Sequence, residues 1–455
     1  MDKVTSQRRK HQQFSYESFN YVKDANDLKI SFVFKISPDI IFNPRIIIQN
    51  LDANIFLRTE KAVIENFIFN LGLIEMFSYW KSTCSPNIEI KAGSLDEKQC
   101  KWWKNLLLNG MGEFFYQNSI NFKEDNFVSI KTAGKANHKK DKNKHKDRYL
   151  VMNSGGRDSV VSLELLKSLK KEVSIFMLNP NRASIAVADT SGVSNRIIVK
   201  REIDKKLLDL NQNGYLNGHT PFSAYLAFLS CLCALLFDYK YIFSSNERSA
   251  NEENVEFQAE KINHQYSKSF EFEKSFRNYV REYLAGDICY LSLLRPLYEI
   301  QISKLFAKQD KYFKVFRSCN RGASTNSWCR KCPKCLSIYI SLYPFIDENK
   351  LIEIFGLDLY EKNNLKDLLL HITGVIKPKP FECVGTYYEI LEGLRLSIKK
   401  LEGKGQSLPY LLKYAKENIL RKNPSSAQIL TSWDKNNFLP PEMGQTLETQ
   451  VKNET

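Results

Sequence analysis

Residues 154–159 read Ser-Gly-Gly-Arg-Asp-Ser and stand where an apolar run ends and an amphipathic segment begins. The apolar run, Tyr149–Asn153, predicts a short buried strand, and Val160–Leu169 carries apolar residues at helical spacing. The glycines therefore occupy a strand-to-helix turn, where they allow positive φ angles and the close approach of a ligand. Because the first turn of a helix offers unpaired N–H groups, the segment predicts a phosphate-binding loop in an α/β protein.

The spacing of these glycines differs from two common nucleotide-binding motifs. A Walker loop needs four residues between its glycines followed by Lys and Ser or Thr, and a dinucleotide fingerprint needs G-x-G-x-x-G. The hexamer instead resembles the SGGxDS loop of the PP-loop family, the N-type ATP pyrophosphatases. This resemblance implies a PP-loop or HUP-like fold whose loop grips the β and γ phosphates of ATP, which is cut to AMP and pyrophosphate. A glycine turn without a ligand is the alternative.

Strands and helices alternate around this loop. Between residues 148 and 345 the pattern gives strands at 173–178, 196–200 and 239–243 and a long apolar helix within 219–237. Such alternation predicts an α/β domain with a doubly wound parallel sheet that binds ATP. The apolar segment 219–237 is near the length of a membrane span, but its polar residues and the strand that follows favour a helix buried against the sheet.

The remainder of the chain predicts two further regions and a linker. Residues 1–130 predict an N-terminal α+β domain, with strand-like runs at 14–21, 28–36 and 45–51 and helices at 61–79 and 98–117. Residues 131–147 predict a basic linker. Residues 346–455 predict a mainly helical C-terminal region, in which we expect the residues from Met443 onward to be frayed.

The charge of the chain is strongly positive. The formal net charge is +15, and the stretch 131–148 alone holds eight lysines or arginines. Since no aromatic residues interleave there for base stacking, a solvated linker is favoured over a nucleic-acid contact.

The composition and the first residues of the chain bear on its location. The apolar content of 43% indicates a globular chain, and residues 1–13 contain no apolar run of the signal-peptide type. We therefore expect the protein in the cytoplasm, without a membrane partner.

A second loop is expected beside the glycine loop. Ser244–Ser249 follows the strand at 239–243 and contains Asn246 and Glu247. Because ligands of parallel sheets bind beyond the carboxyl ends of the strands, we expect both loops on the same rim, with Asn246 near the nucleotide. An ordinary polar loop is the alternative.

Four cysteines predict a metal site. Cys319, Cys329, Cys332 and Cys335 have the spacing C-x9-C-x2-C-x2-C, and four thiolates can enclose Zn²⁺ in a tetrahedron. Four protein ligands leave no open position, so the ion is expected to be structural. An iron–sulfur cluster is the competing interpretation. Nearby cations could meet substrate phosphates, offset the thiolate charge or face solvent; they are Arg317, Arg321, Arg330, Lys331 and Lys334.

The order of glycine loop and cysteine cluster is similar to that of 7-cyano-7-deazaguanine synthase, a zinc-bearing PP-loop enzyme. A closer resemblance covers nearly the whole chain and is to bacterial epimerases that act on UDP-muramoyl dipeptides in peptidoglycan-precursor synthesis. It rests on the glycine loop, the cysteine loop and the segments 77–86, 102–116, 245–254, 263–268, 293–297 and 379–386. Arg157 stands where related loops often have lysine, and the basic stretch is more highly charged than this resemblance leads us to expect.

The resemblance implies that ATP and Mg²⁺ convert the terminal carboxylate of the dipeptide into an acyl-adenylate, so that L-Glu can be epimerised to D-Glu. In this scheme Ser154, Gly155, Gly156 and Ser159 surround the phosphates, Arg157 neutralises developing charge, and Asp158 holds Mg²⁺ or orders the loop. Candidates for proton transfer are Glu247, His264 and Cys383, each of which could instead be structural. Arg295 and Lys268 could bind substrate carboxylates or the diphosphate.

Two other functions remain open at this point. The chain could be a different PP-loop enzyme that uses an adenylate to attach ammonia or sulfur to its substrate. It could also be an RNA-binding protein that keeps the PP-loop fold as a scaffold, with residues 131–148 as the contact.

Overall fold

The computed structural model describes residues 2–52, 56, 59–124, 126–135, 138–423 and 429–453. It shows a mixed α/β protein that divides into two compact units. Unit 1 comprises residues 1–150, 197–242 and 256–290, and unit 2 comprises residues 151–196, 243–255 and 291–455. Each unit is thus assembled from separate segments of the chain.

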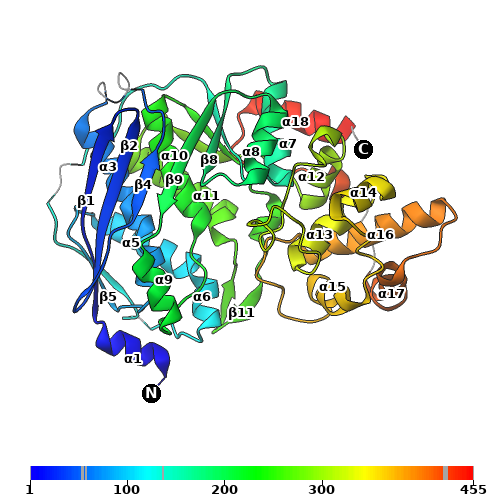
Figure 1. Cartoon of the computed structure of the whole chain (residues 1–455), viewed down its shortest axis with the longest axis horizontal. Coiled ribbons are helices and arrows are strands. Elements are labelled where there is room, and N and C mark those ends of the chain that lie inside the picture. The colour runs from blue at the N-terminus through cyan, green and yellow to red at the C-terminus, as the bar shows by residue number, and fades with distance from the viewer. Residues whose placement is uncertain are drawn as a thin grey trace. The chain divides into compact units, whose positions relative to one another are not determined.

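Unit 1 contains a mixed sheet. Its strands follow one another in the order β9, β4, β2, β1, β5, β6, with β3 beside β2. The bounds are β1 Gln13–Asp24, β2 Asp27–Ile36, β3 Ile40–Phe42, β4 Arg45–Ile48, β5 Asn87–Ile90, β6 Ser129–Thr132 and β9 Arg196–Glu202. The β1–β2, β2–β3, β2–β4 and β4–β9 pairs are antiparallel, whereas β5 runs parallel to both β1 and β6. Figure 1 shows β1, β2 and β4 side by side.

The helices of unit 1 supply most of its apolar core. Helix α3 (Lys61–Glu75) packs against α10 (Phe222–Phe237), and most residues of both helices are buried. The other helices are α1 Lys3–Lys10, α4 Phe77–Trp80, α5 Glu97–Gly110, α6 Gly112–Gln117, α9 Lys205–Gln212 and α11 Phe270–Tyr279. Helix α10 is the expected buried helix within 219–237. Across the described ranges, no helix combines the length and apolar character that a membrane span requires.

Unit 2 contains the carboxyl ends of four neighbouring strands in the order β13, β10, β7, β8. The full strands are β7 Tyr149–Met152, β8 Val173–Leu178, β10 Tyr241–Ser244 and β13 Cys289–Ser292. Leu293 N donates to Ser244 O, and Cys289 N donates to Lys240 O. The constant offset between the bonded residues is that of a parallel pair, so β10 and β13 run in the same direction.

Helices make up the rest of unit 2. They are α7 Arg157–Ser168, α8 Arg182–Ser191, α12 Glu299–Phe306, α13 Pro333–Leu342, α14 Glu348–Phe355, α15 Lys366–Ile372, α16 Tyr387–Gly403, α17 Tyr410–Asn418 and α18 Pro441–Asn453. Helix α12 packs on α7 and α13, and α13 packs on α16, which contacts α17. The yellow to orange ribbons in Figure 1 follow α13 to α17. The described residues after 346 are mainly helical.

Two expectations need correction. Strand β9 does not complete a purely parallel sheet, since it pairs antiparallel with β4, placing Arg45 opposite Glu202 and Ile48 opposite Val199. Its alternating burial is typical of antiparallel strands, whereas β8 is almost wholly buried. The residues from Met443 to Asn453 are not frayed but belong to α18, because Met443, Leu447 and Val451 recur at helical spacing and are buried.

The described part of the basic stretch 131–148 is anchored to unit 1 at Asp141 and His145, while most of its lysines are exposed. Asp141 is buried and forms a parallel bridge with Ala285. The ring of His145 contacts two carboxylates, with Nε2 2.8 Å from Asp141 Oδ2 and Nδ1 3.4 Å from Asp238 Oδ1. Burial lowers the pKa of His145, but the hydrogen bond and charge of Asp141, together with Asp238, outweigh burial and raise it.

Candidate functional site

The glycine loop lies between β7 and α7 in unit 2. Gly155 has a φ angle of +83°, and Gly156 is the extended residue that precedes α7 and has no side chain to cap it. Ser154 N donates to Ser159 Oγ over 3.2 Å, and Gly155 N donates to Asn153 Oδ1 over 2.9 Å. The loop is therefore held in shape by its own polar groups at the N-terminus of a helix.

Gly155 could not be replaced by another residue without strain. Besides its positive φ, a β-carbon there would lie 2.5 Å from Ser184 N and 2.6 Å from the carbonyl carbon of Ala183, at the start of α8. At Gly156 a β-carbon would meet Ser318 Oγ at 3.2 Å, a milder contact. Gly155 is thus required by both conformation and space.

Arg157 is directed into the interior of unit 2. Its guanidinium is fully buried, with Nε 2.7 Å from Asp158 Oδ1 and NH1 2.8 Å from Ser303 Oγ. NH1 also donates to Ser341 Oγ, and NH2 lies 3.4 Å from Glu299 Oε2. Burial lowers the pKa of Arg157, but the charges of Asp158 and Glu299 outweigh burial and raise it. The guanidinium is a buried cation that links α7 to α12 and α13.

A second buried cation completes this network. Lys334 Nζ lies 3.5 Å from Glu299 Oε1, and both side chains are nearly inaccessible. Burial lowers the pKa of Lys334, while Glu299, Asp158 and Cys383 raise it, with a net rise. Of the cations near the cysteine cluster, Lys334 therefore faces inward. We name Arg157, Asp158, Glu299 and Lys334 the buried charge network.

Asn246 and Glu247 follow β10, the neighbour of β7. Asn246 Nδ2 donates to Ser244 Oγ over 3.2 Å, and Ser292 Oγ donates to Asn246 O. Glu247 is buried, its carbonyl accepts from NH1 of the buried Arg295 over 2.8 Å, and its charge helps to raise the pKa of Arg157. Glu247 therefore lies close to the buried charge network.

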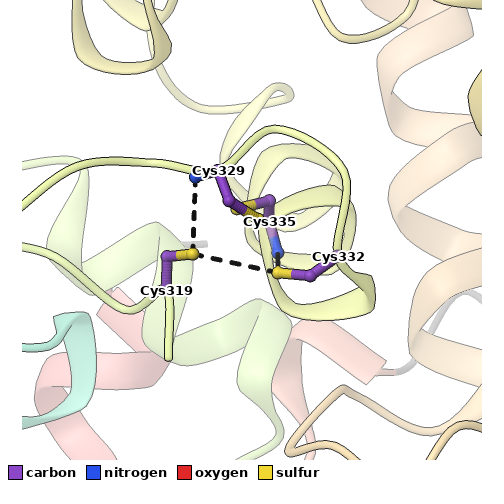
Figure 2. Close-up of side chains that lie close together, drawn as sticks. All are labelled: Cys319, Cys329, Cys332 and Cys335. Atoms are coloured by element: carbon purple, nitrogen blue, oxygen red, sulfur yellow. Dashed lines mark hydrogen bonds between the residues drawn. The ribbon is translucent and has the colours of Figure 1, made fainter. Parts of the chain in front are cut away.

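The four cysteines converge in unit 2 (Figure 2). Cys319 Sγ lies 3.9 Å from Cys332 Sγ, Cys329 Sγ lies 3.7 Å from Cys335 Sγ, and all four sulfurs lie within 4.8 Å of one another. A tetrahedron with metal–sulfur bonds of about 2.3 Å has edges of about 3.8 Å. The arrangement fits a single four-coordinate ion, whereas a four-iron cluster would bind each sulfur to a different iron and hold the sulfurs farther apart.

Hydrogen bonds of backbone groups and of Arg317 fix the loop around the cluster. Backbone N–H groups of Gly322 and Cys329 donate to Cys319 Sγ over 3.3 and 3.4 Å. The guanidinium of Arg317 donates hydrogen bonds to the backbone carbonyls of Lys314, Phe316 and Asn326. Its backbone N–H donates to Gly155 O over 2.8 Å, so the segment that leads into the cysteines also supports the glycine loop.

Cys383 lies in the segment between α15 and α16 and is partly exposed. The charge of Cys383 is among those that raise the pKa of Lys334. The neighbouring Glu382 accepts a hydrogen bond from the backbone N–H of Lys334 over 3.2 Å. Glu382 also lies 3.3 Å from Arg321. Unit 2 thus brings Cys383, Glu247 and the buried charge network into one neighbourhood with the glycine loop.

His264 belongs to unit 1, where it meets two residues that sequence reasoning did not select. Its Nδ1 forms a hydrogen bond with Glu113 Oε2, and the same oxygen lies 3.4 Å from His219 Nδ1. The two imidazole rings are 4.5 Å apart between centroids. Burial, then His264 and the lysines at 81 and 268, lower the pKa of His219 to about 3. These residues come from α6, from the turn before α10 and from the segment after β12 Glu260–Ile262.

Glu113, His219 and Glu299 were missed because each is an isolated polar residue whose partners are distant in the sequence. For two of these residues the sequence itself gave a signal. Glu113 and Glu299 are acidic residues inside short, otherwise apolar segments, 111–115 and 297–300, where burial without a partner would be costly.

Comparison with known proteins matches residues 5–293 to the MurL N-terminal domain and residues 315–423 to the MurL C-terminal domain. Three similar proteins carry the name UDP-N-acetyl-alpha-D-muramoyl-L-alanyl-L-glutamate epimerase. The one from Xanthomonas oryzae pv. oryzae is 32% identical over 343 residues, which are 73% of this chain and 75% of the relative. That from Micromonospora sp. is 34% identical over 72% of this chain and 73% of the relative. That from Salinispora tropica is 38% identical over 55% of each chain.

Proposed function

Because the chain belongs to the MurL family, we propose that it is an epimerase that inverts the terminal L-glutamate of UDP-MurNAc-L-Ala-L-Glu during peptidoglycan-precursor synthesis. The observation that carries this proposal is the similarity to two proteins of that name over 73% and 72% of the chain. The glycine loop and the buried groups around it support a chemistry in which ATP prepares the substrate.

The reaction needs such preparation because the α-proton of glutamate beside an ionised carboxylate is very weakly acidic. Removing it would place a second negative charge on the same small unit. If the carboxylate is first converted to a mixed anhydride, the carbonyl withdraws electrons and the enolate becomes accessible to general bases. Each such base contributes roughly 10²- to 10⁴-fold to the rate.

The proposed cycle has three steps. A carboxylate oxygen of the substrate attacks the α-phosphorus of ATP, the bond to the bridging oxygen breaks, and pyrophosphate leaves with the electron pair. The α-proton of the acyl-adenylate is then removed, and a proton is delivered to the opposite face of the same carbon. Finally, water cleaves the anhydride to give the D-glutamate product and AMP, which makes the cycle directional.

The glycine loop is proposed to hold the phosphates of ATP, as in PP-loop enzymes. Its backbone can approach a phosphate closely because neither Gly155 nor Gly156 has a side chain, and the loop stands at the N-terminus of α7. Ser154 and Ser159, whose hydroxyls are 3.2 Å apart, and Asn246 on the next loop would add polar contacts.

The buried charge network suggests separate roles for Arg157 and Asp158. Since the guanidinium of Arg157 is enclosed by protein groups, we assign it to positioning Asp158 and the start of α7 rather than to direct phosphate contact. Asp158 is the residue proposed to bind Mg²⁺, which would neutralise phosphate charge when ATP is bound. Lys334, paired with Glu299, adds positive charge to the same neighbourhood.

Epimerisation requires proton transfer on two faces of the α-carbon. In unit 2 the candidates are Glu247, which is buried beside Arg295, and Cys383, which is partly exposed near Lys334. In unit 1 the candidate is His264, whose ring is oriented by Glu113. Substituting each in turn and measuring exchange of the α-proton separately from ATP cleavage would identify those that move protons.

The four cysteines are proposed to bind a structural Zn²⁺ ion. Their sulfur separations fit one tetrahedral ion, and with four protein ligands no position remains for substrate. The ion would fix the segment that carries Arg317 N against Gly155 O and would thereby support the glycine loop.

The proposed function is tested by incubating the protein with UDP-MurNAc-L-Ala-L-Glu, ATP and Mg²⁺. After acid hydrolysis, chiral analysis is expected to show D-glutamate, with AMP and pyrophosphate in the nucleotide fraction. Retention of the L configuration would reject the epimerase. Retention with transfer of ammonia or sulfur to the substrate would instead support a PP-loop ligase.

A further inference from the structure

We propose that Glu113, His219 and His264 form a binding site for a divalent transition-metal ion in unit 1, separate from the cysteine cluster of unit 2. Each residue offers one ligand atom, and these atoms lie within 4.8 Å of one another. Two histidines and one carboxylate are a ligand set that zinc and iron enzymes use with open coordination positions.

The separations in the cluster are close to those of bound ligands. Metal bonds of about 2.0–2.2 Å to nitrogen and oxygen place neighbouring ligand atoms about 3.0–3.5 Å apart, and His219 Nδ1 lies 3.4 Å from Glu113 Oε2. His264 is nearer to the same oxygen, so metal binding would replace this hydrogen bond by two metal–ligand bonds, and His264 would then hold the metal ion rather than transfer a proton. The side chains are 8% exposed for Glu113, 15% for His264 and 21% for His219, which limits competition from water.

The surroundings hold the three ligands in place. Gln117 Nε2 donates to Glu113 Oε1 over 2.7 Å and so orients the carboxylate, as outer-shell groups do in metal sites. Lys81 Nζ donates to Gly218 O over 2.7 Å and fixes the turn that carries His219. A β-carbon at Gly112 would lie 3.2 Å from Ile262, so α6 lies against the strand that leads to His264.

The cations near this cluster indicate what would occupy the open positions. Lys81 Nζ donates to the carbonyl oxygen of Gly218, the residue before His219, and the charges of Lys81 and Lys268 contribute to the lowered pKa of His219. These positive charges by themselves repel a divalent cation. They also attract a negatively charged oxygen, and so favour an anion as the remaining metal ligand. The site therefore fits a metal ion that binds a carboxylate or phosphate group.

The experiment is a cobalt titration of the full-length protein after chelation and gel filtration. We expect two equivalents of Co²⁺ to bind, one with the near-ultraviolet thiolate charge-transfer band of a cysteine site and one with visible absorption only. His219→Gln and His264→Gln should each lose the second equivalent and keep the thiolate band, whereas the control His371→Gln should bind both. Acetate and inorganic phosphate, added separately, should show by a change of the visible band which anion binds.

A wild-type protein that binds Co²⁺ only with the thiolate band would overturn the proposal, as would an equivalent without that band that persists in both cluster variants. A visible band that responds to neither anion would overturn the open coordination position. Circular dichroism identifies a variant that fails to fold. In that case the number of Co²⁺ ions bound by the wild-type protein, with their absorption bands, still tests the proposal. Because the readout is metal content, the result is independent of whether the protein is an epimerase.

Discussion

The NH2 group of Arg157 lies 3.4 Å from Oε2 of Glu299, and the two side chains, 0% and 2% exposed, join the first residue of α7 to the first residue of α12. Arg157 also contacts Asp158 at 2.7 Å, and Glu299 is shared with Lys334. A helix that begins at the proposed nucleotide loop is thereby fixed to the helical part of unit 2 through buried charges rather than through apolar packing alone.

We expect Arg157→Met to destabilise the protein by about 3–5 kcal/mol, because it removes a fully buried cation that faces Asp158 and the buried Glu299. Arg157→Lys should cost less, and adding Glu299→Gln to Arg157→Met should recover part of the loss. The control is Arg196→Met, which removes the exposed ion pair with Asp189 and should cost about 1 kcal/mol or less. The measurement is the free energy of unfolding by urea. Equal losses for the Arg157→Met and Arg196→Met variants would contradict the assignment.

Two glycines with positive φ allow the effect of backbone strain to be distinguished from the effect of steric crowding. Gly155 and Gly192 have φ angles of +83° and +73°, but a β-carbon at Gly192 would meet nothing within 4 Å. We expect Gly192→Ala to cost about 1–2 kcal/mol of stability and to leave ATP binding unchanged. Gly155→Ala should cost more, and it should weaken ATP binding at least tenfold because the loop must move away from Ser184.

Calorimetric titration with ATP and Mg²⁺ measures this difference. Gly155→Ala protein that is folded and binds ATP like the Gly192→Ala protein would show that the loop does not hold the nucleotide.

Removal of the metal from the cysteine cluster should loosen the same loop. Cys329→Ser is expected to lower the zinc content by about one equivalent and to reduce the melting temperature, since structural zinc contributes directly to folding. Cys100→Ser is the control, because Cys100 is a partly exposed cysteine of unit 1. Elemental analysis and thermal unfolding provide the readout. An unchanged zinc content in the Cys329→Ser protein would contradict the proposed ligand.

His145, whose side chain is 6% exposed, should make stability depend on pH. Its pKa is raised in the folded protein by Asp141 and Asp238 despite burial, so folding is favoured by protonation of the ring. This contribution is complete below the unfolded pKa of about 6.5 and is lost as pH rises through the higher folded value. Between pH 6 and pH 8, the wild type should therefore lose more stability than His145→Gln. Parallel pH profiles of melting temperature for the two proteins would refute this.

Local structure could be predicted well from the sequence. The strand–loop–helix around residues 154–159 appears as β7 and α7, the run 173–178 is β8, and the helices expected at 61–79 and 98–117 appear as α3 with α4 and α5 with α6. These elements are encoded by apolar periodicity and by glycine, which act within a few residues. The cysteine cluster was predictable for the same reason, since three of its four residues lie within seven positions.

Pairings between distant segments could not be predicted. Nothing in the run 196–200 identifies β4 as its antiparallel partner, because periodicity reports burial and not the neighbouring strand. Likewise, Glu113 and His264 are 151 positions apart, and their contact depends on how α6 packs near β12. Arg157 was expected at the phosphates, but burial among Glu299, Ser303 and Ser341 is set by helices that follow more than 140 residues later.

The central claim is that ATP activates the glutamate carboxylate before the α-proton is removed. Its most direct test is the reaction in D₂O with UDP-MurNAc-L-Ala-L-Glu, with and without ATP, followed by mass spectrometry and chiral analysis of the glutamate. We predict that deuterium enters the α-position and that D-glutamate forms only when ATP is present, with AMP as the nucleotide product. Exchange or inversion without ATP, or cleavage of ATP only to ADP, would contradict the account.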